Sequence, residues 1–430
     1  MSTRYSVAFT TLASGLLCST GAFAQSLNTA DANVAMFTRN RNVAVQDRPR
    51  PEYDALGIRT GSALIYPKLE VSGEYNDNIY ATSSGEQSDE VLHVRPEIFA
   101  ETTWSVNYLS AYVRGSLNRY RDNNTENTNE FAGGVTGRLD VTRLSSVAAG
   151  ADYNSTFEPR TSSSSPSTAV EPIKYKTAQA YISGTYTSGR FRLSSRADVR
   201  NLDYEDGRTG AGAVIDQDNR DRTTTSLTGR IDYAISPDTA VFFQATGNKR
   251  DYDIASTALV PNRDSTGSEF LAGASFEAGH LARGEVSVGY IQQDFDEPTY
   301  QNASGLGARV QLEWFPSELT TVTGSVSRVI EDAVVPGVGA YLTTNTGLTV
   351  DHELLRNVIL TGRLIYARDE YDDIDREDTR FGATLGGTYL LNRNVGVSVT
   401  ASTLQTTSNG TNRDDDFTVN RLAVSLVTQF

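Results

Sequence analysis

From about Ala63 to the C-terminus, apolar and polar residues alternate along the chain in runs of about 12 to 16 residues. In the segment 305–315, GLGARVQLEWF, one set of alternate positions is apolar: Ala308, Val310, Leu312 and Trp314. The positions between them are polar: Arg309, Gln311 and Glu313. Successive side chains of a β-strand point to opposite faces, so this pattern predicts strands with one apolar and one polar face.

Short and long connections alternate between these runs. The short joins lie at residues 105–107, 144–145, 188–189, 236–238, 279–281, 316–318, 354–356 and 392–393. Longer polar loops lie between them, among them residues 81–89, 159–173, 205–220, 369–378 and 409–416. Eight short turns and nine long loops connect about eighteen strands, with sixteen to twenty as the range. The pattern predicts an all-β fold, a transmembrane antiparallel up-and-down β-barrel with short periplasmic turns and long extracellular loops.

A soluble β-sandwich is the alternative, and no single strand excludes it. Sandwich strands average about five or six residues, whereas a tilted membrane strand needs about 9 to 11, so the length of these runs favours the barrel. Aromatic residues also gather near the predicted strand ends, as expected for girdles at two membrane interfaces. They are Tyr66, Trp104, Tyr233, Trp314, Tyr389 and Phe430 on the turn side, and Tyr75, Tyr120, Tyr153, Tyr252, Tyr290 and Tyr366 on the loop side.

The two ends of the chain differ from the alternating region. Residues 1–24 have one basic residue, an apolar middle and a small-x-small ending, which predicts a secretory signal peptide. The sole cysteine, Cys18, lies in it, so the mature chain would contain no disulfide. We expect residues 25–62 to form a basic N-terminal arm, in the periplasm or folded into the lumen, and residues 63–430 to form the barrel. The terminal strand ends on Phe430, which resembles the signal that the outer-membrane assembly machinery recognises.

Composition narrows the classes of function. Apolar residues make up only 38% of the 430 residues, while Gly (35) and Tyr (21) are abundant, which favours strands over helices. The formal net charge is −15, and loss of Arg4 with the signal peptide makes it −16. Such an acidic surface disfavours nucleic acid as a partner. No run of 18 apolar residues follows the signal peptide, so a membrane span would have to be built from strands.

Signals for catalysis or metal binding are weak. The three histidines, His93, His280 and His352, lack the spacing of metal ligands, so we expect no metal and no cofactor. Asp351 and His352 are adjacent on one predicted strand and would point to opposite faces, so they could not easily act as a dyad. The acidic segment 369–378 lacks the spacing and the central glycine of a calcium loop. We therefore expect no enzyme.

The polar face of the strands would line a lumen with charges of both signs in near balance. Cross-strand ion pairs would account for most of these charges. A mixed wall with Tyr, Thr, Ser and Asn between the charges would also offer weak hydrogen bonds to a hydrated polymer. Arg192, Arg196 and Arg200 on one strand are the best candidates for a local anion preference. The residues predicted to line the pore are Arg114, Arg192, Arg196, Asp198, Arg200, Arg230, Arg309, Glu313 and Arg363.

A motif marks the start of the barrel region. The segment 50–59, RPEYDALGIR, is followed by Pro67, by the segment 77–80 (DNIY) and by 88–89 (SD). With these residues, the chain from 48 to 430 resembles a family of outer-membrane β-barrel porins associated with exopolysaccharide gene clusters of Gram-negative bacteria. The resemblance implies an outer-membrane conduit for polysaccharide, fed by a periplasmic polysaccharide-export protein. Few functional residues are defined for that family, so none is carried over.

Two interpretations of the motif remain open. One is contact with the periplasmic partner through Arg50, Tyr53, Asp54 and Arg59, and the other is a fixed entry into the first strand.

For the whole chain, we expect a non-enzymatic channel in the outer membrane, surrounded by lipid and lipopolysaccharide, that exports an exopolysaccharide. A general or solute-specific diffusion porin is the alternative. The 38 residues before the barrel are too few for the plug of a TonB-dependent transporter. A hydrolase would need a cluster of nucleophile, base or metal ligands that the pattern lacks.

Overall fold

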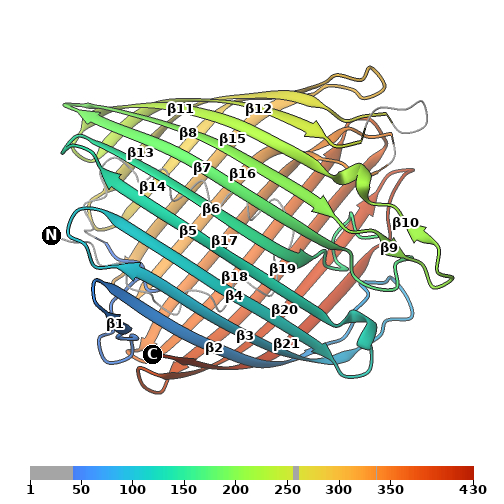
Figure 1. Cartoon of the computed structure of the whole chain (residues 1–430), viewed down its shortest axis with the longest axis horizontal. Coiled ribbons are helices and arrows are strands. Elements are labelled where there is room, and N and C mark those ends of the chain that lie inside the picture. The colour runs from blue at the N-terminus through green and yellow to red at the C-terminus, as the bar shows by residue number, and fades with distance from the viewer. Residues whose placement is uncertain (1–41, 255–260, 336) are drawn as a thin grey trace.

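The structure is a computed structural model that describes residues 42–254, 261–335 and 337–430. Eighteen long strands form one closed antiparallel barrel (Figure 1). The first seven are β2 (Ala63–Asn76), β3 (Asp89–Thr102), β4 (Tyr108–Tyr120), β5 (Thr128–Asp140), β6 (Ser145–Phe157), β7 (Lys174–Ser188) and β8 (Phe191–Tyr204). The others are β11 (Arg222–Ser236), β12 (Thr239–Tyr252), β13 (Ser265–Ala278), β14 (Ala282–Phe295), β15 (Ala303–Ser317), β16 (Thr320–Asp332), β17 (Ala340–Leu355), β18 (Val358–Tyr371), β19 (Arg376–Leu390), β20 (Val395–Asn409) and β21 (Phe417–Gln429).

The barrel closes because its first and last strands pair. β2 and β21 run antiparallel with Val71 opposite Leu426, and every other long strand pairs with its neighbours in chain order. The fold class predicted from the alternating pattern, including the count of eighteen strands, is confirmed. The short elements are β1 (Ile58–Thr60), which belongs to the same sheet, β9 (Gly207–Arg208) and β10 (Val214–Ile215), which form a separate two-stranded sheet, and the 3-10 turns η1 (Asn124–Glu126) and η2 (Asp218–Arg220). Among the described residues, no helix is long and apolar enough to span a membrane.

The connections alternate in length, as the sequence predicts. Turns such as 189–190 and 237–238 lie at the end of the barrel that holds the C-terminus, and loops such as 158–173 and 205–221 lie at the opposite end (Figure 1). The predicted loop at 369–378 is wrong, because β18 and β19 extend into it and leave only residues 372–375 between them. The ion pair between Arg380 and Asp369 joins these two strands, so the charged residues here belong to the ladder.

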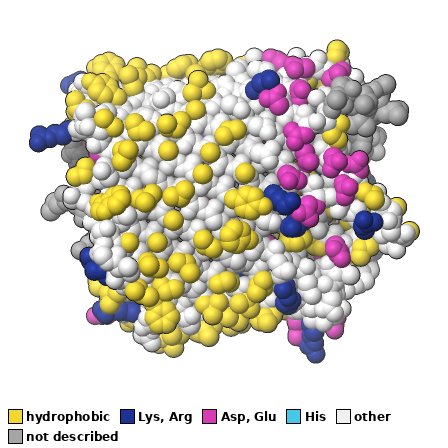
Figure 2. All heavy atoms as spheres, viewed as in Figure 1, with side chains coloured by type: hydrophobic (Ala, Val, Ile, Leu, Met, Phe, Trp, Pro, Cys, Tyr) yellow, Lys and Arg dark blue, Asp and Glu magenta, His cyan; other side chains and the backbone are white. Residues whose placement is uncertain are grey.

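The face of the barrel seen in Figure 2 carries many apolar side chains over the strands, and acidic side chains gather at the end of the long loops. On β21 the outward residues Leu422, Val424 and Leu426 are exposed, while Ala423, Ser425 and Val427 between them are buried. The predicted aromatic residues that lie exposed are Trp104, Tyr233, Trp314, Tyr389 and Phe430 on the turn side, and Tyr75, Tyr153, Tyr290 and Tyr366 on the loop side.

Three residues predicted for the girdles point inward instead. Tyr66 and Tyr120 line the central cavity, and Tyr252 is only 8% exposed. Tyr66 has the same parity in its strand as Lys68, and Tyr120 the same as Arg114, and both of these charged residues face the cavity. The position of a residue in the alternating pattern therefore decides whether its side chain faces the cavity or the outer surface. Aromatic character near a strand end does not decide this.

Buried ion pairs fasten the long loops to one another. Arg220 in η2 makes two hydrogen bonds, of 2.7 and 3.0 Å, to the carboxylate of Glu158 in the loop before β7. Arg160 in that same loop binds Glu126 in η1 at 2.6 and 3.0 Å. Burial acts to lower the pKa of Arg220, but the hydrogen bonds and charge of Glu158 leave it raised, so the guanidinium stays charged. Three successive loops are thus linked.

Residues 42–57, here called the arm, lie against the inner wall of the barrel at the turn end. The backbone N–H of Val45 donates to Thr321 Oγ1 at 2.9 Å, and Gln46 Nε2 donates to Asp351 Oδ1 at 2.7 Å. Val45 is fully buried and packs against Ile359 and Leu390. These contacts place the arm across β16, β17, β18 and β19, inside the barrel.

The arm leads into the barrel through a short hairpin. β1 pairs with the start of β2, with Ile58 opposite Ile65. Gly57 precedes it at a φ of +72°, and a Cβ there would lie 2.8 Å from the ring of Tyr66. Both the left-handed backbone and the close ring favour glycine at this position.

Candidate functional site: the central cavity

A central cavity of about 4000 Å³ lies within the barrel. Its lining includes all nine residues that the sequence assigned to the pore: Arg114, Arg192, Arg196, Asp198, Arg200, Arg230, Arg309, Glu313 and Arg363. Basic and acidic side chains line it in nearly equal number. The wall is therefore polar and close to neutral, although the whole chain carries a net charge of −15.

Most of the arginines on the wall are held by carboxylates. Arg230 binds Asp232 at 2.8 Å and both oxygens of Glu285 at 2.8 and 2.9 Å. Arg309 Nη2 donates to Glu269 at 2.9 Å, from β15 across to β13. Such pairs cancel charge in the wall, as the sequence analysis expected for most of the inward charges.

Further pairs follow the same rule elsewhere in the wall. Arg283 binds Glu313 at 2.5 Å, and Arg95 binds Glu70 at 2.8 Å. Arg196 and Asp198 are two residues apart on β8, and Arg196 donates three hydrogen bonds of 2.7 to 3.0 Å to this one carboxylate. The pairing thus occurs both along one strand and between strands.

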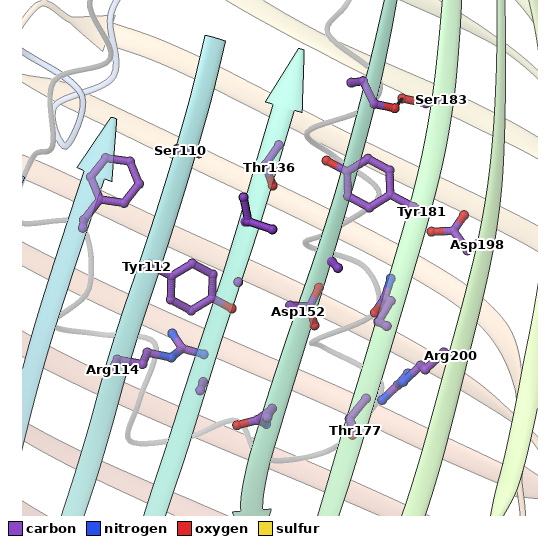
Figure 3. Close-up of a pocket in the computed structure, with 18 of the residues that line it drawn as sticks. Ser110, Tyr112, Arg114, Thr136, Asp152, Thr177, Tyr181, Ser183, Asp198 and Arg200 are labelled. Atoms are coloured by element: carbon purple, nitrogen blue, oxygen red, sulfur yellow. Dashed lines mark hydrogen bonds between the residues drawn. The ribbon is translucent and has the colours of Figure 1, made fainter. Parts of the chain in front are cut away.

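The inner face of β4 to β8 is open and rich in hydroxyl groups. It carries Ser110, Thr136, Thr177 and Ser183 between aromatic and charged side chains, and Figure 3 shows these residues on neighbouring strands. The lining there also contains Asp152, whose strand parity predicts an inward position, and Tyr112 and Tyr181, which are not among the predicted pore-lining residues. Strand parity predicts an inward position for both tyrosines, but only charged residues were chosen as pore-lining candidates.

The four residues predicted to contact a periplasmic partner differ in how far their side chains are exposed. Arg50 is only 3% exposed, and its Nη2 donates to Glu353 Oε2 at 3.0 Å and to the Val45 carbonyl at 2.8 Å. Burial lowers the pKa of Arg50, and the adjacent carboxylate of Glu353 opposes this shift. The side chain is engaged inside the barrel and does not offer itself to a periplasmic partner in this conformation.

The other three residues of the motif are less enclosed. Tyr53 is half-buried and packs on the apolar cluster around Val45. Asp54 accepts a hydrogen bond of 2.6 Å from the backbone N–H of Arg50, which closes a turn of the arm. Arg59 is exposed at the start of the barrel. The motif at 50–59 forms the entry into β2, and of its four candidates Arg59 has the most accessible side chain.

Phe430, the predicted assembly signal, follows β21 at the seam where the barrel closes. It is 57% exposed on the outward side, and its backbone N–H donates to the carbonyl of Pro67 at 3.2 Å. The signal peptide predicted for residues 1–24 lies outside the described residues.

The histidines take part in separate hydrogen bonds. Nδ1 of His93 lies 2.7 Å from Asn118 Oδ1, and Nδ1 of His352 lies 3.0 Å from Thr320 Oγ1. Asp351 bonds instead with Thr361 and Gln46 inside the barrel. Asp351 and His352 therefore have separate partners.

One acidic cluster lies in a loop that the sequence analysis did not consider for metal binding. The carboxylates of Asp206, Asp216 and Asp218 are exposed and lie within 4.8 Å of one another. The charge of Asp206 raises the pKa of Asp218, with smaller effects of burial and of Asp216. Exposed carboxylates often gather without binding an ion, so we assign no metal to them.

A closed, transmembrane, antiparallel barrel around a polar cavity defines the class of this protein as a porin-like β-barrel. Residues 50–430 match the model of the family described as "Putative beta-barrel porin 2", and the chain belongs to that family. The family predicted from the motif is thereby confirmed in its coarser sense, an outer-membrane barrel porin family.

Solved structures with a similar outline are outer-membrane barrels. The siderophore receptor PirA from Pseudomonas aeruginosa is 10% identical, with a TM-score of 0.45, covering 85% of this chain and 80% of its own. OccK3 (OpdO) from the same organism is 13% identical, with a TM-score of 0.44 and coverage of 85% and 96%. The copper transporter OprC is 11% identical, with a TM-score of 0.47 and coverage of 87% and 81%. A comparison with curated protein sequences finds no match.

Proposed function

We propose that this protein is a non-enzymatic channel of the outer membrane through which an exopolysaccharide leaves the cell. The observation that carries the proposal is the cavity wall, in which paired charges of both signs alternate with hydroxyl, amide and aromatic side chains. A hydrated polymer needs many weak hydrogen-bonding positions along its path, because one strong site would trap it.

The dimensions of the barrel support the same proposal. Barrels of about 16 to 18 strands leave an aqueous channel, and this one has eighteen. The turn end with the arm would face the periplasm, where a polysaccharide-export protein would deliver the polymer. The loop end would face the lipopolysaccharide surface. Phe430 at the seam would serve the assembly machinery that inserts the barrel.

A deletion strain without a paralogue tests the proposal. Polymer synthesis should continue while polysaccharide at the cell surface is lost, and a plasmid copy of the gene should restore it. If surface polysaccharide stays unchanged in the deletion strain, the proposal fails.

The family match favours a second candidate, a diffusion porin for small solutes. Conductance of the purified full chain in planar bilayers separates the two candidates. Two results together would favour the diffusion porin. One is a large pore that passes small solutes without any partner, and the other is polymer export that stays intact in the deletion strain.

A further inference from the structure

A strip of small residues, called the groove below, runs along the inner face of β5 and β6. The inward positions there include Gly134, Ala148 and Gly150. Gly134 is opposite Tyr112 of β4, and Gly150 is opposite Tyr181 of β7. The groove is therefore bordered by one tyrosine on each side.

Both tyrosine rings lie over the groove's glycines. A Cβ added to Gly134 would come within 2.7 Å of Cε1 of Tyr112, and one added to Gly150 within 2.7 Å of Cε1 of Tyr181. Figure 3 shows the two rings, with the strands that carry Thr136 and Asp152 between them. An aromatic ring that lies along a wall offers an apolar face to the C–H face of a sugar ring, and its hydroxyl group adds a hydrogen-bonding position.

The groove is also the part of the wall where arginines have unused hydrogen-bonding capacity. Asp152, in the groove, lies within electrostatic range of Arg200, Arg114 and Arg196. Arg196 is committed to Asp198 and is stacked 3.9 Å over the ring of Tyr181.

The other two arginines differ from Arg196 in this respect. No hydrogen bond or ion pair within the described part of the chain engages the guanidinium of Arg114 or Arg200, and Nε of Arg200 is buried without a partner. Arg114 and Arg200 therefore keep free N–H donors beside the groove, although Glu97 lies opposite Arg114 in the sheet and Glu331 lies within electrostatic range of Arg200.

Arg230 on β11, the strand next to β8, and Arg309 on β15 have no such free guanidinium group. The guanidinium of Arg230 is shared between two carboxylates, and that of Arg309 is bound to Glu269. An anionic group in the cavity would therefore find its unsatisfied donors on β4 and β8. A guanidinium group binds a planar carboxylate through two parallel N–H donors, which suits a uronate better than a neutral sugar.

We propose that the inner face of β4 to β8 is a binding subsite for a carboxylate-bearing sugar unit, a uronate, of the transported polymer. The inference rests on the proposed function and names its substrate class. Arg114 and Arg200 bind the carboxylate, Tyr112 carries the sugar ring, and hydroxyls such as Thr136 and Thr177 bond to its hydroxyl groups. Asp152 keeps the site weak by competing for the same guanidinium groups, which allows the polymer to move on.

Blocking of the ion current tests the subsite. The full chain is inserted into planar bilayers, and oligogalacturonate and maltohexaose are compared as an acidic and a neutral probe. We expect oligogalacturonate to interrupt the current at about tenfold lower concentration, because its carboxylates form charge-assisted hydrogen bonds that the neutral probe lacks. The double variant R114Q/R200Q should raise the blocking concentration of oligogalacturonate about tenfold and leave that of maltohexaose unchanged.

Matched variants separate the subsite from general charge effects. R121Q removes one positive charge from an exposed pair on a loop and should leave both probes unaffected. Tyr112→Ala should weaken block by both probes, because it removes the surface that carries the sugar ring. Heat-modifiable migration on gels shows which variants are folded, and R114K/R200K provides a second pair that keeps the charge but loses the bidentate geometry.

Two outcomes would overturn the subsite. Equal block by both probes in the wild type would remove the preference for uronates while leaving a glycan channel in place. Unchanged block by oligogalacturonate in folded R114Q/R200Q would remove the two arginines from the site. Neither result tests the proposed function itself. That function would be refuted if the deletion strain kept its surface polysaccharide unchanged.

Discussion

Arg230 illustrates how single residues keep the wall of the barrel neutral. Its guanidinium lies between Asp232 and Glu285 and stacks 3.6 Å over the ring of Phe242. Arg230 is 7% exposed and Asp232 is 3% exposed, so neither charge is well solvated by bulk water. Removal of the arginine would leave two acidic groups close together without a counter-charge.

We therefore predict that Arg230→Ala lowers the free energy of unfolding by about 3 to 5 kcal/mol. Urea titration of the folded barrel in detergent, followed by tryptophan fluorescence, measures the change. Lys249→Ala is the control, since it breaks an exposed pair with Asp251 and should leave the midpoint where it is. An Arg230→Ala midpoint equal to that of the wild type would show that water inside the cavity solvates the two acids.

The sequence predicts which face of the barrel a residue lies on, but it does not predict which residue forms an ion pair with it. Strand parity places Arg230 on the cavity wall, because the period of two is a local property of the chain. Its partner Glu285 is 55 residues away on β14, three strands beyond β11 in the sheet, and only the curvature and register of the closed barrel bring them together. Asp152 on β6 likewise comes within range of Arg200 on β8 only through the register of the strands between them.

Among the elements, the arm shows best what the sequence leaves open. The sequence offered two positions for it, in the periplasm or in the lumen, and the described residues 42–57 lie against the inner wall. The deciding contacts are with Thr321, Asp351 and Glu353, which are far away in the sequence. A local motif indicates that a segment has a defined conformation, but it does not show which distant residues the segment packs against.

The ion pair of Arg50 with Glu353 holds the arm, and we predict that Arg50→Ala loosens it. Both partners are nearly inaccessible, with side chains 3% and 4% exposed. A cysteine introduced at Val45, which is fully buried, reports on the arm through its rate of reaction with a maleimide. The rate should rise about tenfold in Arg50→Ala, as expected from the loss of a charge-assisted hydrogen bond.

Two variants make this measurement decisive. Glu353→Gln removes the other half of the pair and should accelerate labelling as well. Arg59→Ala alters an exposed arginine next to the arm and should leave the rate unchanged. Equal labelling rates in all variants would show that the backbone and apolar contacts of Val45 hold the arm without the ion pair.

The whole molecule separates its charge between the cavity and the surface. The net charge of −15 would by itself suggest a cation-selective channel. Basic and acidic groups balance within the cavity, however, and acidic side chains gather at the end of the long loops (Figure 2). Salt screens charges beyond about 8 to 10 Å, so the loop acids have little effect on ions deep in the channel.

We accordingly predict weak ion selectivity, with a reversal potential close to zero in a salt gradient across a planar bilayer. Asp152→Asn should shift the reversal potential toward anion selectivity, because it leaves Arg114 and Arg200 without their shared carboxylate in the open groove. Glu90→Asn removes an acid that is 64% exposed at the loop end and should leave the reversal potential unchanged. Strong cation selectivity in the wild type would contradict this prediction. It would mean that the acids of the loops, rather than the wall of β4 to β8, determine which ions pass, and that the balance of charges in the cavity does not.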